Sequence, residues 1–139
     1  MPITLRARDL MDSNVVFVDA STTVLDAVKK MAQQNVWSLV VEKGGLPVGV
    51  VTERDILRSC VAKGIRLEAA RVEEIMTSPL ITISPEAHIG QVMELMVEKG
   101  IRRVYIVDNG KVTGRITQTM LFEDSLNVME SLSSMRYHL

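Results

Sequence analysis

The sequence predicts an α/β fold (α+β type) in which two β-α-β-β-α units pack as one pseudo-twofold module. The chain of 139 residues is 47% hydrophobic and 24% charged, which is typical of a folded domain with a buried core. It aligns with itself at an offset of 65 residues, and both copies have the same order of strand and helix patterns. Because a unit of about 60 residues is marginal for a core of its own, the two copies are expected to pack together.

The internal repeat aligns without a gap from residue 9 to residue 57. Leu39-Val40-Val41 falls on Val104-Tyr105-Ile106, and the apolar positions match almost throughout. Identical residue types meet at Met11, Ser13, Met31, Gly45, Gly49 and Thr52. Low identity with a preserved pattern is typical of a duplicated structural unit. The expected divisions are a first unit over residues 8–64, a linker over 64–72, a second unit over 72–130 and a tail over 131–139.

The first half of each unit reads as a strand followed by an amphipathic helix. The first strand is expected from Val15 to Val18. Thr23, with Asp26 three residues later, is an N-cap signal for the helix that follows. Apolar residues then recur at helical spacing, at Val24, Ala27, Val28 and Met31 in one copy and at Ile89, Val92, Met93 and Met96 in the other.

The second half of each unit reads as a β-hairpin followed by a helix. Leu39–Val41 and Val48–Thr52 are β-rich runs joined by Lys43-Gly44-Gly45, a hairpin signal. Asp108-Asn109-Gly110-Lys111 is the matching turn of the second copy. A last helix is expected to begin after the second run and to end near Gly64.

Composition excludes several function classes. The formal net charge is -1 and aromatic residues make up 4%, so neither the basic footprint nor the stacking platform of a nucleic-acid binder is expected. The single cysteine, Cys60, cannot form an intrachain disulfide and is expected to be a small buried hydrophobe. With two histidines, His88 and His138, no metal site and no cofactor are expected.

Enzymes and membrane proteins are disfavoured as well. The sequence has no nucleophile elbow, no Walker loop and no paired His/Cys ligand set, so we expect no catalysis. It has no apolar run of 18 residues, and Met1–Arg6 lack the apolar stretch of a signal peptide. The expectation is a soluble, cytoplasmic protein that does not contact a membrane.

The junction Gly49-Val50-Val51-Thr52-Glu53-Arg54-Asp55, together with the tandem units, resembles a pair of CBS domains, also called a Bateman module. Further signatures of that family are Ile75-Met76-Thr77, Ser84-Pro85-Glu86-Ala87 and Gly100-Ile101-Arg102-Arg103-Val104. The resemblance runs from about Leu10 to Leu126. It implies a regulatory module that binds an adenosine-containing ligand between the two units, with AMP, ADP or ATP preferred over S-adenosylmethionine. Spacing does not decide among these ligands.

Two residues of this junction suit a nucleotide. Thr52 stands where a strand ends and a helix begins, so free backbone N–H groups are expected there to face an anion such as a phosphate. Asp55, one turn later, is a carboxylate that can accept hydrogen bonds from a ribose diol. The same Thr52-x-x-Asp55 spacing also predicts a capping box, which needs no ligand. Both interpretations stay open.

By resemblance, residues of the other unit complete this nucleotide site. The residues carried over from the family pattern are Val50, Thr52, Asp55, Leu80, Ile81, Ile101, Arg102 and Arg103. The apolar ones are expected to flank the base, and the two arginines stand where the family often has phosphate-binding residues. Adjacent side chains diverge on a strand, so Arg102 is expected to contact phosphate directly. A solvated surface pair of arginines is the alternative.

The site related by the repeat departs from the family pattern. Met120 stands where Asp55 stands in the first copy, and Trp37 and Ser38 occupy the places of Arg102 and Arg103. We therefore expect one functional site per chain. The other is expected to be closed mainly by apolar side chains, those of Val15, Val16, Val36, Trp37 and Met120, beside Thr117. Trp37 is expected to be a packing residue.

Two functions follow from these features. The leading one is a sensor in which a nucleotide shifts the packing of the two units, and the shift is passed to a separate effector protein. The alternative is a homodimerising interaction scaffold that regulates a partner protein without a physiological nucleotide. In either case a homodimer is expected through helical faces that bear Ile56, Leu57, Cys60, Leu121, Phe122, Met129 and Leu132.

Overall fold

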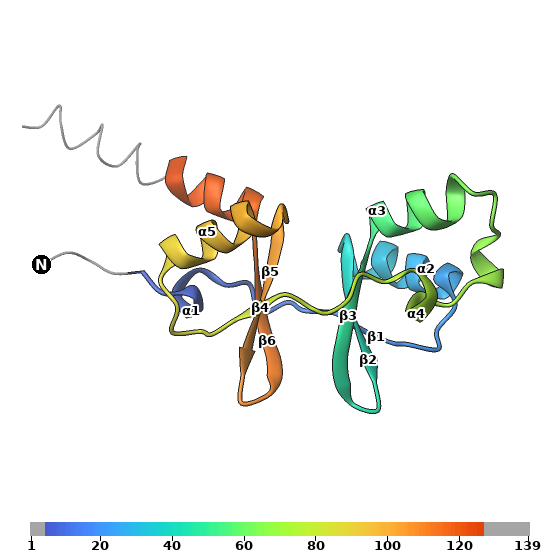
Figure 1. Ribbon diagram of the computed structural model, residues 1–139, viewed down its shortest axis with the longest axis horizontal. Coiled ribbons are helices and arrows are strands. Elements are labelled where there is room, and N and C mark those ends of the chain that lie inside the picture. Colours follow the sequence, from blue (N-terminus) through green and yellow to red (C-terminus); the bar gives the residue numbers. More distant parts are fainter. Residues whose placement is uncertain (1–4, 127–139) are drawn as a thin grey trace, which may run out of the picture.

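The computed structural model describes residues 5–126 and places two sheets at the centre of the molecule, with helices on their outer sides (Figure 1). The first elements are α1 (Ala7–Leu10), β1 (Phe17–Asp19), α2 (Val24–Gln34), β2 (Ser38–Lys43), β3 (Leu46–Thr52) and α3 (Glu53–Ile56). A π-helical turn η1 (Leu57–Val61), a 3-10 turn η2 (Leu67–Ala69) and α4 (Val72–Ile75) follow. The last are β4 (Thr82–Ile83), α5 (Ile89–Lys99), β5 (Arg103–Asp108) and β6 (Lys111–Thr117). A further helix begins at residue 118 and is described as far as residue 126.

Each sheet has three strands in sequence order, β1-β2-β3 and β4-β5-β6. In both sheets the first strand runs parallel to the second, which forms an antiparallel hairpin with the third. The strand registers repeat as well, since Val40 pairs with Val50 in one sheet and Tyr105 pairs with Arg115 in the other. The predicted α/β fold, with two copies of one β-α-β-β-α unit, is therefore confirmed.

Each sheet buries one face beneath its own helices. The first core contains Val24, Ala27 and Met31 of α2 with Leu39, Val41 and Val51 of the sheet. The second core contains Val92 and Met96 of α5 with Val104, Ile106 and Ile116. The helical spacing predicted for α2 and α5 is confirmed by these buried residues, except that Met93 is exposed. The two cores are separate, so each repeat buries its own apolar stripe.

The short helix that precedes each first strand packs on the opposite unit. α1 contributes Ala7 to the second core, whereas α4 contributes Val72 to the first core. Figure 1 shows α1 beside α5 and α4 beside α2. The first unit therefore consists of β1–β3 with α2, α3 and α4. The second unit consists of β4–β6 with α1, α5 and the helix over residues 118–126. The chain crosses between the units in two crossing segments, residues 11–16 and 76–81.

Gly49 and Gly114 allow the crossing segments to lie against the third strand of each sheet. A Cβ atom at Gly49 would stand 2.7 Å from the backbone oxygen of Thr77 and 2.9 Å from Sδ of Met76. A Cβ atom at Gly114 would stand 2.5 Å from Sδ of Met11. Real Cβ atoms do not approach other atoms this closely, so the identity of these two positions in the repeat has a steric cause.

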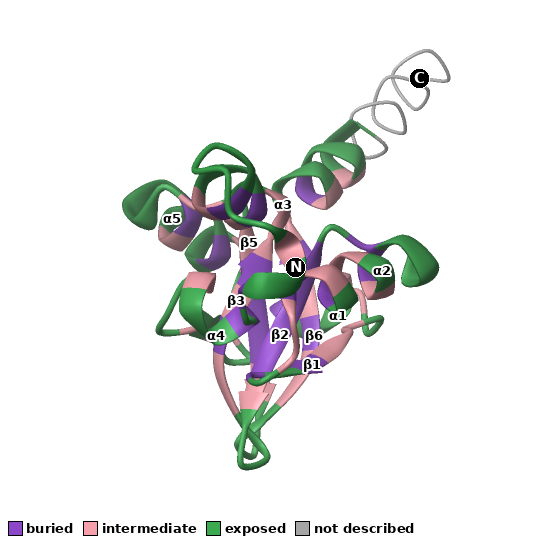
Figure 2. Ribbon diagram, turned by 90° about the vertical axis from the view of Figure 1, so that its right-hand side faces the viewer, coloured by how far each residue is buried: buried purple, intermediate pink, exposed green. Residues whose placement is uncertain are grey.

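The two sheets contact each other through side chains on their inner faces. Val40 and Tyr105 occupy equivalent positions in the repeat and are buried, yet neither belongs to a core. Side chains alternate along a strand, so both point away from the helices and toward the other unit. Figure 2 shows buried residues along the strands at the centre of the molecule. The Tyr105 hydroxyl lies 2.9 Å from the hydroxyl of buried Ser38. Burial raises the pKa of Tyr105, so the phenol stays protonated and takes part in this bond as a neutral group.

Most local predictions are confirmed. The amide of Asp26 donates to the Thr23 hydroxyl at 3.2 Å, which caps α2. The hairpin turns take positive φ at Gly44 and Gly45, and at Asn109 and Gly110, as this turn chemistry requires. The first strand begins at Phe17 rather than Val15, because the chain is still crossing from the other unit before that point and pairs with β2 from Phe17 onward.

Candidate functional site

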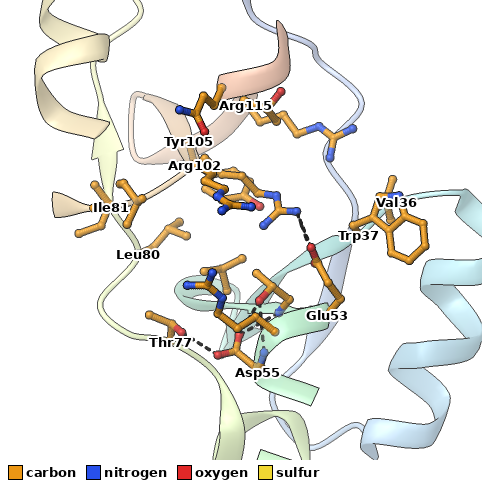
Figure 3. Close-up of a pocket in the computed structure, with 18 of the residues that line it drawn as sticks. Val36, Trp37, Glu53, Asp55, Thr77, Leu80, Ile81, Arg102, Tyr105 and Arg115 are labelled. Carbon is orange, nitrogen blue, oxygen red and sulfur yellow. Dashed lines mark hydrogen bonds and ion pairs between the residues drawn. The ribbon is translucent and has the colours of Figure 1, made fainter. Parts of the chain in front are cut away.

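A cleft with a volume of about 940 Å³ lies between the two units. All eight residues predicted for a ligand site line it, namely Val50, Thr52, Asp55, Leu80, Ile81, Ile101, Arg102 and Arg103. The first three come from β3 and α3, the next two from the second crossing segment, and the last three from residues 101–103, where β5 begins. Figure 3 labels Asp55, Leu80, Ile81 and Arg102 of this set. The size is within the range of small-molecule sites, so the cleft is the candidate functional site.

Asp55 is held at the edge of the cleft by three hydrogen bonds. Its Oδ2 accepts from the amide of Thr52 at 2.9 Å and from the hydroxyl of Thr52 at 3.2 Å. Its Oδ1 accepts from the hydroxyl of Thr77 at 2.9 Å. The amide of Asp55 donates to the Thr52 hydroxyl at 3.4 Å, so the predicted capping box is formed. A carboxylate offers about four acceptor positions, so one remains for a ligand hydroxyl.

The backbone donors at the start of α3 are less available than the sequence predicts. The amide of Glu53 donates to the backbone oxygen of Trp37 at 3.3 Å. The amide of Asp55 is bound to Thr52. The expectation of free N–H groups is therefore wrong for these two amides, because the chain supplies its own acceptors. Side chains, rather than these amides, are left to hold an anion in the cleft.

The two arginines at the start of β5 differ in their partners. Nη2 of Arg103 lies 3.2 Å from Oε1 and 3.4 Å from Oε2 of Glu53, and the arginine side chain is 25% exposed. The Arg102 side chain is exposed and has no hydrogen bond or ion pair with any residue between 5 and 126. The predicted divergence of the two side chains agrees with this difference. Arg102 is thus available to a ligand without breaking an internal contact.

The lining of the cleft carries an excess of positive charge. It contains five arginines, Arg54, Arg58, Arg102, Arg103 and Arg115, and two carboxylates, Glu53 and Asp55. A cleft lined by one sign of charge concentrates ions of the opposite sign, over a screening distance of about 10 Å at ordinary ionic strength. This composition favours an anionic ligand.

The half of the cleft related by the repeat is polar, so the expected apolar closure is wrong there. Nη2 of Arg115 lies 3.3 Å from Oδ2 of Asp12, and Nε of Arg115 is buried without a hydrogen-bond partner among the described residues. Trp37, expected to be a packing residue, is 66% exposed at the cleft, because the neighbouring Val36 takes the place in the core. Val15, Val16 and Met120 do not line the cleft.

Sequence reasoning misses several residues of the cleft. Thr77 and Glu53 lie inside the family motifs, so motif membership was the available signal for both. Arg115 stands where the first copy has Val50, and a charged residue at an otherwise apolar repeat position is also a usable signal. No local signal pairs Arg115 with Asp12 or Arg103 with Glu53, because the partners are 103 and 50 residues apart.

The helical surface expected to form a homodimer is only partly exposed. Leu57 is 57% exposed and Phe122 is 65% exposed, with exposed Val61 and Leu126 near them in sequence. Ile56, Cys60 and Leu121 are buried in the two cores, on the inward faces of their helices, and their assignment to an interface is wrong. Met129 and Leu132 lie outside the described residues, as does the tail over 131–139.

Cys60 is fully buried, as predicted, and burial raises the pKa of its thiol. The neutral thiol is the unreactive form, which fits a packing role. Within residues 5–126 no His, Cys, Asp or Glu side chains gather in a group that could hold a metal ion. Over the same residues, no helix is long and apolar enough to cross a membrane.

Comparison with known families identifies both repeats. The family model described as CBS domain matches this chain twice, over residues 7–62 and over residues 72–127. The two matches together cover most of the chain.

Individual relatives agree with the family match. The mitochondrial CBS domain-containing protein CBSX3 of Arabidopsis thaliana is 35% identical over 111 residues, covering 76% of this chain and 54% of that protein. The chain thus spans about half the length of this curated relative. A conserved protein from Pyrococcus horikoshii has a similar structure, with a TM-score of 0.82, 33% identity and coverage of 90% of this chain and 95% of that one. The hexameric CBS-CP12 protein from bloom-forming cyanobacteria has a TM-score of 0.82 and 33% identity, covering 90% and 74%.

Proposed function

This chain belongs to the CBS domain family, as two CBS domains in tandem, and we propose that it is a regulatory module whose cleft senses an adenine nucleotide. A tandem CBS pair is consistent with a regulatory role, and proteins with CBS domains are generally regulatory rather than catalytic. The proposed ligands are AMP, ADP and ATP, with S-adenosylmethionine as a second class. The proposed output is a separate effector protein.

The composition of the cleft carries the proposal. One cavity between the units gathers the eight residues expected from the family pattern and adds an excess of arginine over carboxylate. A nucleotide requires three features, and the cleft has each of them. Apolar side chains suit the base, a carboxylate with one acceptor position left suits the ribose, and cationic side chains suit the phosphate. No single one of them is specific, but a nucleotide uses all three together.

Each feature has a role in the proposed complex. The apolar residues Leu80, Ile81 and Ile101 flank the base. Asp55 accepts a ribose hydroxyl, and rotation of the Thr77 hydroxyl away from Oδ1 makes room for a second one. Arg102 binds the phosphate, because its guanidinium is exposed and has no partner among the described residues. Guanidinium–phosphate pairs are charge-assisted and can be bidentate, which makes this contact strong.

Binding acts on the contact between the two units. Near the cleft they are joined by the hydrogen bond of Tyr105 with Ser38 and by the ion pair of Arg103 with Glu53. A ligand that touches both walls favours one relative placement of the units over others. Its effect on that equilibrium equals its difference in affinity for the two placements.

Titration calorimetry with adenosine, AMP, ADP, ATP and S-adenosylmethionine tests this function. We expect AMP to bind more tightly than adenosine, and Arg102→Gln to weaken AMP binding about tenfold while leaving adenosine binding unchanged. Arg66→Gln is the control, because Arg66 is exposed and pairs with Glu68 rather than lining the cleft. Absence of binding by all five compounds, or equal AMP affinity in wild type and Arg102→Gln, contradicts the proposal.

A second function, as a self-associating scaffold that regulates a partner without nucleotide, is favoured by the exposed apolar residues on two helices. Leu57 follows α3 and Phe122 lies in the helix over residues 118–126, so both units contribute. The structurally similar CBS-CP12 protein is a hexamer, so related chains assemble. Sedimentation of Leu57→Lys and Phe122→Lys variants is expected to show loss of a homodimer. An unchanged sedimentation coefficient in both variants contradicts the proposed interface.

A further inference from the structure

Within residues 5–126, one ion pair joins the first unit to the second. Glu53 is the first residue of α3, and Arg103 is the first residue of β5. Nη2 of Arg103 lies 3.2 Å and 3.4 Å from the two carboxylate oxygens of Glu53, across the cleft (Figure 3). Four of the other ion pairs of the described chain lie within one unit, and the pair of Arg115 with Asp12 joins the second unit to the first crossing segment. This contact is therefore the electrostatic link between the two walls.

The link exists in only one half of the pseudo-twofold module. The repeat places Gln118 at the position of Glu53 and Ser38 at the position of Arg103. Neither is charged, and the Ser38 hydroxyl bonds to Tyr105 instead. The ion pair is thus not a general requirement for packing one unit on the other. It is confined to the half of the cleft that contains Asp55.

The position of Glu53 conflicts with a phosphate in the cleft. Arg102 and Arg103 both line the cleft, so a phosphate that enters it can be bound by either of two guanidinium groups, the exposed one of Arg102 or that of Arg103. The Arg103 guanidinium is already occupied by the Glu53 carboxylate. Two anions near one cation repel each other, and this repulsion is stronger in a partly desolvated cleft than in water.

We propose that Glu53 is a resident anion of the cleft, which competes with the ligand's phosphate for Arg103. The proposal rests on the proposed nucleotide function and adds a residue that sets its selectivity. Glu53 lowers the affinity for phosphate-bearing ligands and leaves the affinity for the nucleoside portion unaffected. A phosphate that takes Arg103 releases Glu53, and with it the ion pair between the units. Occupancy by a nucleotide, but not by adenosine, is thereby coupled to the contact of the two walls.

Glu53→Gln separates these effects, since it removes the charge and keeps the shape of the side chain. By titration calorimetry, we expect Glu53→Gln to bind AMP about tenfold more tightly than wild type, at the low end of the couplings measured for close charge pairs. Adenosine affinity is expected to stay unchanged. In an Arg103→Gln background the gain in AMP affinity is expected to disappear, because the guanidinium for which Glu53 and the phosphate compete is absent. Glu94→Gln is the control, an exposed carboxylate of α5 outside the cleft.

The outcomes separate this proposal from the function on which it rests. If wild type binds AMP and Glu53→Gln binds it equally or more weakly, Glu53 is not a competitor, whereas nucleotide sensing stands. If Glu94→Gln increases the AMP affinity as much as Glu53→Gln does, the effect comes from net charge and the proposal is overturned. If neither wild type nor Glu53→Gln binds AMP or adenosine while both remain folded by circular dichroism, the sensing function and the competition both fall. A gain restricted to Glu53→Gln and dependent on Arg103 supports the competition.

Discussion

Replacing Asp55 by alanine is expected to destabilise the protein even without a ligand. The carboxylate accepts two hydrogen bonds from Thr52 and one from Thr77, which belongs to the second crossing segment. Loss of a capping box and of a charge-assisted bond costs about 2 kcal/mol, after the Thr52 and Thr77 groups regain hydrogen bonds to water. With an unfolding entropy of about 2.1 cal/mol/K per residue, this corresponds to a decrease in Tm of about 7 °C for a chain of this length.

Thermal unfolding followed by circular dichroism measures this change, and Asp26→Ala provides a matched control. Asp26 occupies the same third position of a helix, α2, after the N-cap Thr23. Its exposed carboxylate accepts no hydrogen bond within the described chain, and only its amide is bound to Thr23. We expect Asp26→Ala to change the free energy of unfolding by less than about 0.5 kcal/mol, as surface substitutions do. Equal Tm values for the two variants would refute the reasoning about the Asp55 cap.

The same variant also tests the proposed ribose contact, provided that the shift in Tm caused by ligand is compared rather than Tm itself. AMP at 100 times its Kd adds about 2.7 kcal/mol to the free energy of unfolding of the wild type. With the same unfolding entropy, this raises Tm by about 9 °C. Asp55→Ala is expected to show almost no rise at that concentration. A full rise in the variant would leave Asp55 as a structural cap without a role in the ligand site.

The remaining predictions concern packing and titration. Gly49→Ala is expected to lower the free energy of unfolding, measured in urea, by about 1–3 kcal/mol, because the new Cβ meets the second crossing segment. Gly90→Ala, which has open space around it in α5, is expected to raise the free energy of unfolding by up to about 1 kcal/mol. If Gly90→Ala were the less stable variant, the steric argument would be contradicted. Because burial raises the pKa of Tyr105 above its usual 10, the wild type keeps its full stability below pH 10 and loses part of it above pH 10. Tyr105→Phe is expected to remove this loss. If the free energy of unfolding falls equally with pH above 10 in both proteins, the reasoning is refuted. Cys60 is expected to react with a thiol reagent only as fast as the protein unfolds, and rapid labelling of the native protein would show that the site opens locally.

Local structure was predictable because its causes lie in neighbouring residues. The Thr23 cap is set by the residue three positions later, and the Asn109-Gly110 turn is set by the tolerance of these two residues for positive φ. The buried faces of α2 and α5 follow from helical spacing of apolar residues. The start of β1 was not predictable in this way, since it depends on where a segment arriving from the other unit first meets β2.

The candidate site was predictable as a set of residues but not as a network of contacts. The resemblance to CBS domains, which the motif around Thr52 and Asp55 and the repeat carry, implies eight of the residues that line the cleft. The exposure of Trp37 was not predictable from its type, because a tryptophan more often packs in a core. The capping box at Asp55 was predictable, whereas its third hydrogen bond, from Thr77, depends on the path of the second crossing segment.

The sequence by itself determined the duplication, the β-α-β-β-α order of each unit and the apolar stripes that bury each sheet, because periodicity and turn chemistry act over a few residues. Only the tertiary structure decided that α1 packs on the second unit and α4 on the first, through crossing segments that fit against Gly49 and Gly114. That exchange brings Thr77 to Asp55, and the packing of the units brings Glu53 to Arg103. Contacts of this kind join residues that are distant in the chain, so they depend on how whole units fit together rather than on any local pattern.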